Sequence, residues 1–503
     1  HRPLTSCLLG LYSCRWRRKH GSLARPGDCC CSKSEGASFG VLAAAFCLTL
    51  LFLYFWTQAK NDYNDFDRFN YGNLGFWWAW SLVLLVIAAL FFSYVAGLML
   101  LAVCLLSQGQ SLSLHWSHKI VVMLSLMFAI AAIAVMSDLW ALEWITVRLS
   151  FQVTAPYLHV GGVSLMTALA WPVALHFFRR YLILVVYLSI LLALYLVPLG
   201  MYSPCIRNRG TLGPPPKLFG HRGAPMMAPE NTAMAFEKAV EAGCDGLETD
   251  VIISYDGVPF LMHDRSLRRT TNVDEVFPNH GDKMSDMYTW PELRRLNAGA
   301  WFLSQTDPYG TVGSLGAEDR QRAGEQPVCT LLEFLEVAAR YDKLVIFDLY
   351  RPPREHPYSN LWIQRTLDVI RNESTIKPSQ VLWLNPEFRE LVQEQEEDFQ
   401  QTSGTVDSIE RLQSQHINRL NLHYTSMHYA AANITTNLYV ISEAWIYSVA
   451  WCTGAHSVTT NAPHILKAMK QPLFLMTPDE YKTMWLVTDV LSLLLVASIF
   501  TLH

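Results

Sequence analysis

The order of apolar and polar positions separates this chain into a strongly apolar part and a part of mixed character. Five apolar stretches long enough to cross a bilayer as helices precede residue 205, and a sixth closes the chain. These stretches cover residues 38–57, 80–105, 120–141, 157–178, 181–202 and 484–502. The pattern predicts a multi-pass α-helical membrane region, with five transmembrane helices over 38–203 and a sixth over 484–502.

Residues 217–480 follow another pattern, in which short β-rich runs alternate with helical stretches. Strands are predicted at 218–220, 246–254, 344–349, 381–384, 419–423, 437–441 and 457–460. Alternation sustained over this length favours an α/β barrel or an open doubly wound sheet. A linker over 204–216, ending in three consecutive prolines, separates this domain from the apolar part.

Composition agrees with a membrane-embedded protein. The 503 residues are 51% hydrophobic and 16% charged, whereas soluble domains contain about 25% charged residues. The net charge is −4 and no basic stripe runs along the chain, which argues against a nucleic acid partner. The pattern does not indicate an oligomeric state.

Positive charges flank the apolar stretches unevenly and thereby predict an orientation. They gather in segment 1–37 and in the loops after the second and fourth stretches, whereas the loops between are acidic or mixed. Because positive loops stay in the cytoplasm, both chain ends are expected there. Residues 204–483 are then expected on the extracellular or lumenal side, and the plasma membrane is the expected location. Sequons at Asn372 and Asn433 lie in the segment expected outside and predict N-glycosylation.

The cysteines divide by this topology. Cys29, Cys30 and Cys31 precede the first apolar stretch and are either palmitoylated or unmodified thiols. Four others would lie in a compartment that permits disulfides and would allow three complete pairings, between which the sequence does not choose. These four are Cys205, Cys244, Cys329 and Cys452.

Two histidines, His159 and His176, lie within or at the edge of the fourth apolar stretch. An ionisable side chain inside a membrane is a functional hypothesis by default. We find no acidic partner for them inside the spans, and therefore interpret both as packing or interfacial residues.

Residues suited to catalysis gather in one short part of the mixed domain. His221 and Arg222 follow the first predicted strand, and His263 follows the second. Glu248 and Asp250 alternate along the second strand, so both side chains point to one face, where carboxylates are costly unless paired or metal-bound. They favour a hard cation such as Ca²⁺ or Mg²⁺. The set is typical of phosphodiester cleavage, in which a cation and an arginine offset phosphate charge and histidines move protons.

These residues lie in motifs that resemble the signature of glycerophosphodiester phosphodiesterases. The motifs are His221-Arg222-Gly223, Pro229-Glu230-Asn231-Thr232, Glu248-Thr249-Asp250, Asp256-Gly257-Val258-Pro259 and His263-Asp264. Ser203-Pro204-Cys205 and Arg351-Pro352-Pro353 resemble the vertebrate multi-pass subgroup of that family. The resemblance implies a (β/α)8 TIM barrel over 217–480 with a small inserted subdomain at about 265–326.

The resemblance also implies a role for each site residue. His221 and His263 are general acid and base, Arg222 binds the substrate phosphate, and Glu230 and Asn231 support the site. Asn231 is also expected to cap the first helix. One divalent cation, Ca²⁺ or Mg²⁺, is held by Glu248, Asp250 and Asp348.

Four positions depart from the family pattern and put rate and substrate choice in question. Asp348 and Tyr350 stand where the family usually has Glu and Lys, and Ser442 and Asn461 where it commonly has Asn and Asp. No departure removes a histidine or a ligand on the second predicted strand.

The reaction implied by the resemblance uses the substrate's own hydroxyl, which attacks phosphorus to give a cyclic phosphate that water opens. Glycerophosphocholine and glycerophosphoinositol are the expected substrates. The alternatives are cleavage of inositol-phosphate lipid anchors by the same site, or a catalytically weak barrel that serves as receptor or scaffold. Stabilisation by a divalent cation is expected of the enzyme and not required of a scaffold.

Overall fold

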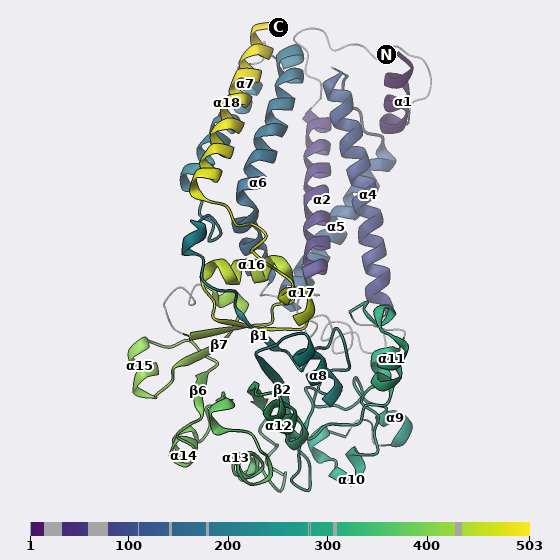
Figure 1. Cartoon of the computed structure of the whole chain (residues 1–503). Helices are drawn as coiled ribbons and strands as arrows, with labels where there is room; N and C mark the ends of the chain where they lie inside the picture. The colour runs from purple at the N-terminus through teal and green to yellow at the C-terminus, as the bar shows by residue number, and fades with distance from the viewer. Residues whose placement is uncertain are drawn as a thin grey trace. The chain divides into compact units, whose positions relative to one another are not determined.

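The structure, a computed structural model, describes residues 2–14, 33–58, 79–108, 110–139, 143–177, 181–279, 281, 283–304, 309–427 and 435–502. The chain forms two compact units. One consists of residues 1–206 together with 476–503, and the other of residues 207–475. Figure 1 shows the helices of the first unit and the sheet of the second.

The first unit is helical, and most of the described part of each of the six predicted apolar stretches lies on one of its helices. These are α2 (Lys33–Gln58), α4 (Ala79–Ser107), α5 (Trp116–Leu139), α6 (Glu143–Pro172), α7 (Tyr181–Gly200) and α18 (Pro478–Leu502). Among the described residues, five helices are long and apolar enough to cross a membrane, and the corresponding apolar segment of α7 is shorter, at Leu184–Gly200. A further helix, α1 (Arg2–Ser13), was not predicted; its Tyr12 is buried against Leu42, Val95 and Leu98.

The pairing of α6 with α18 corrects the interpretation of His159. Its Nε2 lies 3.0 Å from Oδ1 of Asp489 on α18, and Oδ2 of Asp489 accepts a hydrogen bond from Trp485 at 2.6 Å. The expectation that the spans hold no acidic partner was therefore wrong. Asp489 lies within the first third of the last apolar stretch, where an unpaired carboxylate would be costly. The structure does not describe the side chain of His176.

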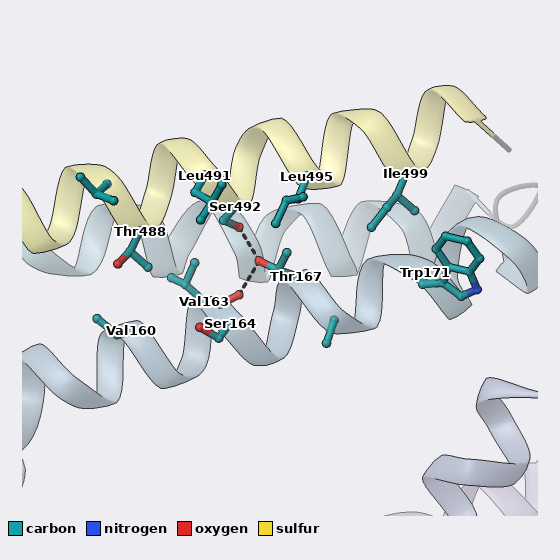
Figure 2. A pocket seen from close by; sticks show the side chains of 12 residues that line it. Val160, Val163, Ser164, Thr167, Trp171, Thr488, Leu491, Ser492, Leu495 and Ile499 are labelled. Carbon is teal, nitrogen blue, oxygen red and sulfur yellow. Dashed lines mark hydrogen bonds between the residues drawn. The ribbon is translucent and has the colours of Figure 1, made fainter.

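A groove of about 520 Å³ lies between the same two helices. Most of its lining is apolar, and Thr167 and Ser492 face each other across it, with their hydroxyl oxygens 2.6 Å apart (Figure 2). The Tyr195 hydroxyl lies 2.7 Å from that of Ser492 and brings α7 into the same polar contact. The helices are thus joined by side-chain hydrogen bonds as well as by apolar packing.

The second unit is a closed parallel barrel. Eight strands run in the ring order β1, β2, β4, β5, β6, β7, β8 and β9, and β1 closes the ring by pairing with both β2 and β9. Their bounds are Lys217–Gly220, Gly246–Ile253, Leu344–Leu349, Val381–Trp383, Gln400–Ser403, Arg419–His423, Thr435–Tyr439 and Ser457–Thr460. The predicted α/β barrel is confirmed, and closure of the ring excludes the open sheet. Strand β6 was not predicted.

Helices follow the strands and lie around the outside of the sheet (Figure 1). They are α8 (Ala233–Glu241), α12 (Leu331–Arg340), α13 (Trp362–Asp368), α14 (Arg389–Gln395), α15 (Ile409–Ser414), α16 (Ala444–Thr453) and α17 (Pro463–Lys467). Thr330 and Glu333 form a capping box that fixes the start of α12, and the apolar face of that helix packs on the sheet.

A segment of short helices lies between β3 (Pro259–Leu261), which pairs antiparallel with β2, and α12. It contains α9 (Val273–Val276), η6 (Ser285–Met287), α10 (Trp290–Leu293), η7 (Ala300–Leu303), η8 (Val312–Ser314) and α11 (Ala317–Gly324). Leu267, Tyr288 and Leu293 pack with Ile252 and Phe260 of the sheet. The segment therefore forms a small subdomain fixed to the barrel beside β2.

Cys205 and Cys452 are disulfide-bonded, whereas Cys244 and Cys329 are buried free thiols. None of the three complete pairings of these four cysteines is therefore present. Asn372 is exposed in the π-helical turn Val369–Glu373 that follows α13. Asn433, Cys29, Cys30 and Cys31 lie outside the described residues.

Candidate active site

Three acidic residues converge on two neighbouring barrel strands, β2 and β4. Asp250 on β2 lies in register with Asp348 on β4, and Glu248 lies two residues earlier on the same face of β2. Each residue offers a carboxylate oxygen, and these oxygens lie within 4.8 Å of one another. Within the described part of the chain this is the only such group of three or more potential ligands.

The electrostatics of this group favour a bound cation. Burial, together with the charges of Asp250 and Asp348, raises the pKa of Glu248 well above its usual range. Asp348 remains accessible to solvent, yet desolvation of its carboxyl and the charge of Asp250 raise its pKa to about 6. Burial also opposes ionisation of Asp250, but Arg222 and the histidines outweigh it and lower its pKa. Three hard oxygen donors that repel one another fit Ca²⁺ or Mg²⁺.

His221 lies beside these carboxylates, directly after β1. Its backbone N–H donates to Thr460 at 2.9 Å, and its Nδ1 lies 2.6 Å from Oδ1 of Asn461. In this orientation the amide oxygen accepts the Nδ1 proton, so Nε2 is the nitrogen that faces Glu248, 4.0 Å from Oε2. Nδ2 of Asn461 has no hydrogen-bond partner among the residues that the structure describes.

The turn after His221 requires an unusual backbone. Arg222 and Gly223 both have positive φ, at 50° and 90°. A Cβ on Gly223 would lie 2.6 Å from the backbone carbonyl carbon of Ala235 in α8, so the turn can approach the helix only with glycine. The turn directs the Arg222 backbone N–H to Oε2 of Glu248 at 2.8 Å.

The Arg222 guanidinium is buried among carboxylates. Its Nη1 lies 2.9 Å from Oε1 of Glu230, and its Nε lies 3.2 Å from Oδ2 of Asp250. Burial opposes ionisation of Glu230, but Arg269 and Arg222 outweigh it and lower its pKa to about 2. Glu230 is therefore a carboxylate at neutral pH.

Asn231 supports the ligands and does not cap the helix, which corrects one prediction. Its Nδ2 donates to Asp250 at 3.2 Å and its Oδ1 accepts from Thr249 at 2.8 Å. Thr232 is the N-cap of α8, and its hydroxyl accepts from the Ala235 N–H at 3.3 Å. Asn231 has a φ of 56°, which turns its side chain toward β2 two residues before the helix begins.

His263 lies beyond β3, where Asp264 and Tyr350 surround it. Its Nδ1 lies 2.7 Å from Oδ1 of Asp264. The Tyr350 hydroxyl donates to Oδ1 of Asp250 at 3.2 Å, and the Tyr350 ring lies edge-on to the imidazole at 6.5 Å. Tyr350 thus contacts both a carboxylate and a histidine of the predicted set.

One residue of this region, Arg269, was not singled out in the sequence; it bonds both Asp264 and Glu230. Ser442, one of the departures from the family pattern, accepts from the Asn461 backbone N–H at 3.2 Å. Arg269 directly follows Arg268 in the inserted segment. Arg269 is buried and Arg268 is exposed, but the sequence pattern around them does not indicate which is which. All the predicted catalytic, phosphate-binding, metal-binding and supporting residues lie in this one region of the barrel.

Comparison with known proteins places the chain among phosphodiesterases. Residues 221–435 match the sequence profile of the Glycerophosphoryl diester phosphodiesterase family. The chain is 44% identical to glycerophosphodiester phosphodiesterase domain-containing protein 5 of Gallus gallus, over 98% of this chain and 83% of that protein. It is 38% identical to domain-containing protein 4 of Mus musculus, over 99% and 85%. It is 40% identical to the glycerophosphoinositol inositolphosphodiesterase GDPD2 of Mus musculus, over 99% and 93%.

Solved structures resemble half of the chain. A phosphodiesterase of Oleispira antarctica in complex with the product sn-glycerol-3-phosphate is 22% identical, with a TM-score of 0.40, over 50% of this chain and 96% of that one. A glycerophosphodiester phosphodiesterase of Agrobacterium tumefaciens is 21% identical, with a TM-score of 0.36, over 50% and 100%.

Proposed function

This chain belongs to the glycerophosphoryl diester phosphodiesterase family, and we propose that it hydrolyses glycerophosphodiesters in a reaction that requires a divalent cation. The observation that carries the proposal is the convergence of Glu248, Asp250 and Asp348, with ligand oxygens within 4.8 Å of one another, beside two histidines. One Ca²⁺ or Mg²⁺ held by these carboxylates would offset the negative charge of the phosphate.

The surroundings of the histidines suggest how they divide the proton transfers. The amide oxygen of Asn461 accepts from Nδ1 of His221, which leaves Nε2 to accept a proton from the attacking hydroxyl. His263 has a carboxylate partner in Asp264, which favours it as the group that gives a proton to the leaving oxygen. The bond from phosphorus to the leaving oxygen breaks as the new ester bond forms.

The substrate's own hydroxyl is the proposed nucleophile, so the first product is a cyclic phosphate. Water then opens the ring, with the histidines exchanging roles, and one phosphomonoester and one alcohol leave. Arg222 is the proposed phosphate-binding residue, and its pairing with Glu230 and Asp250 fixes the guanidinium beside the carboxylates.

Glycerophosphocholine and glycerophosphoinositol are the proposed substrates. The relative named as a glycerophosphoinositol inositolphosphodiesterase supports the second of these. Two alternatives stand beside them. One is cleavage of an inositol-phosphate lipid anchor at this site, and the other is a weak barrel that acts as receptor or scaffold.

We also propose the orientation deduced from the positive charges, with both chain ends in the cytoplasm and the barrel extracellular or lumenal. The exposed position of Asn372 supports glycosylation there. Enzymatic removal of N-glycans from the cell-expressed protein is expected to increase its mobility on a denaturing gel, and Asn372→Gln is expected to reduce that change. No glycan on the wild type would contradict this orientation.

The direct test is hydrolysis by the purified full-length protein. Glycerophosphocholine, glycerophosphoinositol and an inositol-linked lipid anchor are offered with Ca²⁺ or Mg²⁺ and then with a chelator. Glu248→Gln with Asp250→Asn is expected to lower turnover by more than about 100-fold and to abolish thermal stabilisation by the cation. Asp274→Asn, at an exposed acid of the inserted segment, is the matched control. Cation binding without turnover of any substrate would favour the scaffold.

A further inference from the structure

We propose that Arg269 is a positioning residue that holds both the proton-transferring His263 and the phosphate-binding Arg222 through their carboxylate partners. The inference rests on the proposed function of the site. It also gives the inserted subdomain a role in the reaction, because Arg269 lies in that segment and not on a barrel strand.

The contacts of Arg269 are divided between two acids. Its Nε and Nη2 bond the two oxygens of Asp264 at 2.7 and 3.0 Å. Its Nη1 and Nη2 bond the two oxygens of Glu230 at 2.8 and 2.7 Å. Four hydrogen bonds with fixed directions determine the orientation of both carboxylates, which a single ammonium group could not do in the same geometry.

Each of these acids in turn bonds a residue of the proposed machinery. Asp264 lies 2.7 Å from Nδ1 of His263, and Glu230 lies 2.9 Å from Nη1 of Arg222. Basic and acidic side chains therefore alternate in one connected series, from His263 through Asp264, Arg269 and Glu230 to Arg222 and Asp250. Arg269 stands at the centre of the series and joins its two halves.

The site of Arg269 is enclosed and built by the subdomain. Its side chain is 7% exposed, and the guanidinium lies 5.9 Å from the centre of the Trp301 ring in η7. Next to Trp301, Phe302 packs against Met234 and Ala235 at the start of α8. The segment is thereby fixed to the helix that follows the turn of Arg222.

The contacts of Arg269 described above are to Asp264 and Glu230, and they link it to the cation ligand Asp250 through Arg222. Glu248, Asp250 and Asp348 are themselves held on barrel strands, so a change at Arg269 should disturb proton transfer and phosphate binding more than cation binding. This separation provides a readout that a general loss of structure would not give.

The test compares Arg269→Lys and Arg269→Gln with Arg268→Gln in the full-length protein. Arg268 is the adjacent residue, half-exposed and paired with Asp274. Both Arg269 variants are expected to lower kcat by about 10- to 100-fold. Stabilisation by Ca²⁺ or Mg²⁺ against thermal unfolding should persist, and Arg268→Gln should match the wild type. Two results would overturn the proposal. One is turnover of Arg269→Gln within twofold of the wild type. The other is that Arg269→Lys loses both its turnover and its thermal stabilisation by the cation.

A second comparison tests the route through Asp264. Arg269→Lys is expected to reduce kcat less in an Asp264→Asn background than in the wild type, because one of the two carboxylates it positions is already absent. Equal reductions in both backgrounds would contradict the coupling. A wild-type protein without cation-dependent turnover would instead overturn the proposed function, so the two failures are distinguishable.

Discussion

At the scale of single residues, the site depends on how each ionisable side chain is paired. Glu230 illustrates this, because it is almost completely buried and yet has a pKa of about 2. Two arginines supply the stabilisation that water supplies in the unfolded chain. Asp348, with few cations around it, has a pKa of about 6. The opposite pKa shifts distinguish a carboxylate that arginines already stabilise from one that a further positive charge would stabilise.

Glu230 gives a prediction about acid stability. Its pKa is lowered on folding, from 4.5 to about 2, so its stabilising contribution is complete above pH 4.5 and is lost as the pH falls toward 2. The shift corresponds to about 3 kcal/mol. Glu230→Gln should be less stable than the wild type at pH 7 and should lose less stability between pH 4.5 and 2. Thermal unfolding followed by tryptophan fluorescence across this range measures both, and parallel curves for the two proteins would contradict it.

The free thiol of Cys244 gives a prediction about reactivity. Burial and the charge of Asp245 raise the pKa of Cys244 to about 12, so the native protein holds almost no thiolate there at pH 8. Iodoacetamide should leave Cys244 unmodified in the native protein and modify it in denaturant, as measured by peptide mass spectrometry. Exposed Cys14, within the described part of the chain, is the internal control and should react in both states. Rapid modification of Cys244 by iodoacetamide in the native protein would contradict the burial of this thiol.

At the scale of elements, the helices and strands were more predictable than the contacts between them. Apolar stretches and β-rich runs are local signals, and both gave correct elements. Strand β6, with the sequence Gln-Gln-Thr-Ser, was missed because polar side chains are buried there, against the usual pattern. Asn231 was assigned as the cap because Asn is a strong N-cap residue. The next residue, Thr232, can also cap a helix, and the positive φ of Asn231 makes Thr232 the cap.

The turn between β1 and α8 gives a prediction at this scale. Gly223→Ala places a methyl group against the backbone of Ala235 and imposes a positive φ on alanine. We expect a loss of unfolding free energy of at least about 1–3 kcal/mol and reduced activity, because His221 and Arg222 directly precede the position. Gly213→Ala is the control, since a Cβ there meets nothing within 4 Å. Equal melting temperatures for Gly223→Ala and Gly213→Ala would contradict the close approach of Gly223 to the backbone of Ala235.

At the scale of the whole molecule, the contacts that the sequence did not reveal join residues far apart in the chain. His159 and Asp489 are 330 positions apart, and His221 and Asn461 are 240 apart. Residue types indicated which side chains needed partners, as for the carboxylates of β2, but not which partners they would find. Only closure of the barrel and packing of α6 on α18 bring these pairs together.

The α6–α18 pair gives the last prediction. Asp489→Ala removes the partner of His159 and of Trp485 within the apolar helices, so it should lower the thermal stability of the helical unit. Val490→Ala, at an exposed neighbour on the same helix, is the matched control and should have little effect. Proteolysis of detergent-solubilised protein at rising temperature, followed by the release of α18, measures the difference. Similar release from both variants would contradict a stabilising role for the pair.

The helical unit is built from residues 1–206 and 476–503, which has a consequence for its biosynthesis. A ribosome adding about 5–20 residues per second needs roughly 15–65 s to proceed from His159 to Asp489, which follows it by 330 positions. During that interval the nascent chain contains His159, but its hydrogen-bond partner Asp489 has not yet been translated. Among the described apolar helices α18 is translated last, and it supplies the partner of His159. A stop codon between the barrel and Asp489 would release a chain in which His159 lacks this carboxylate.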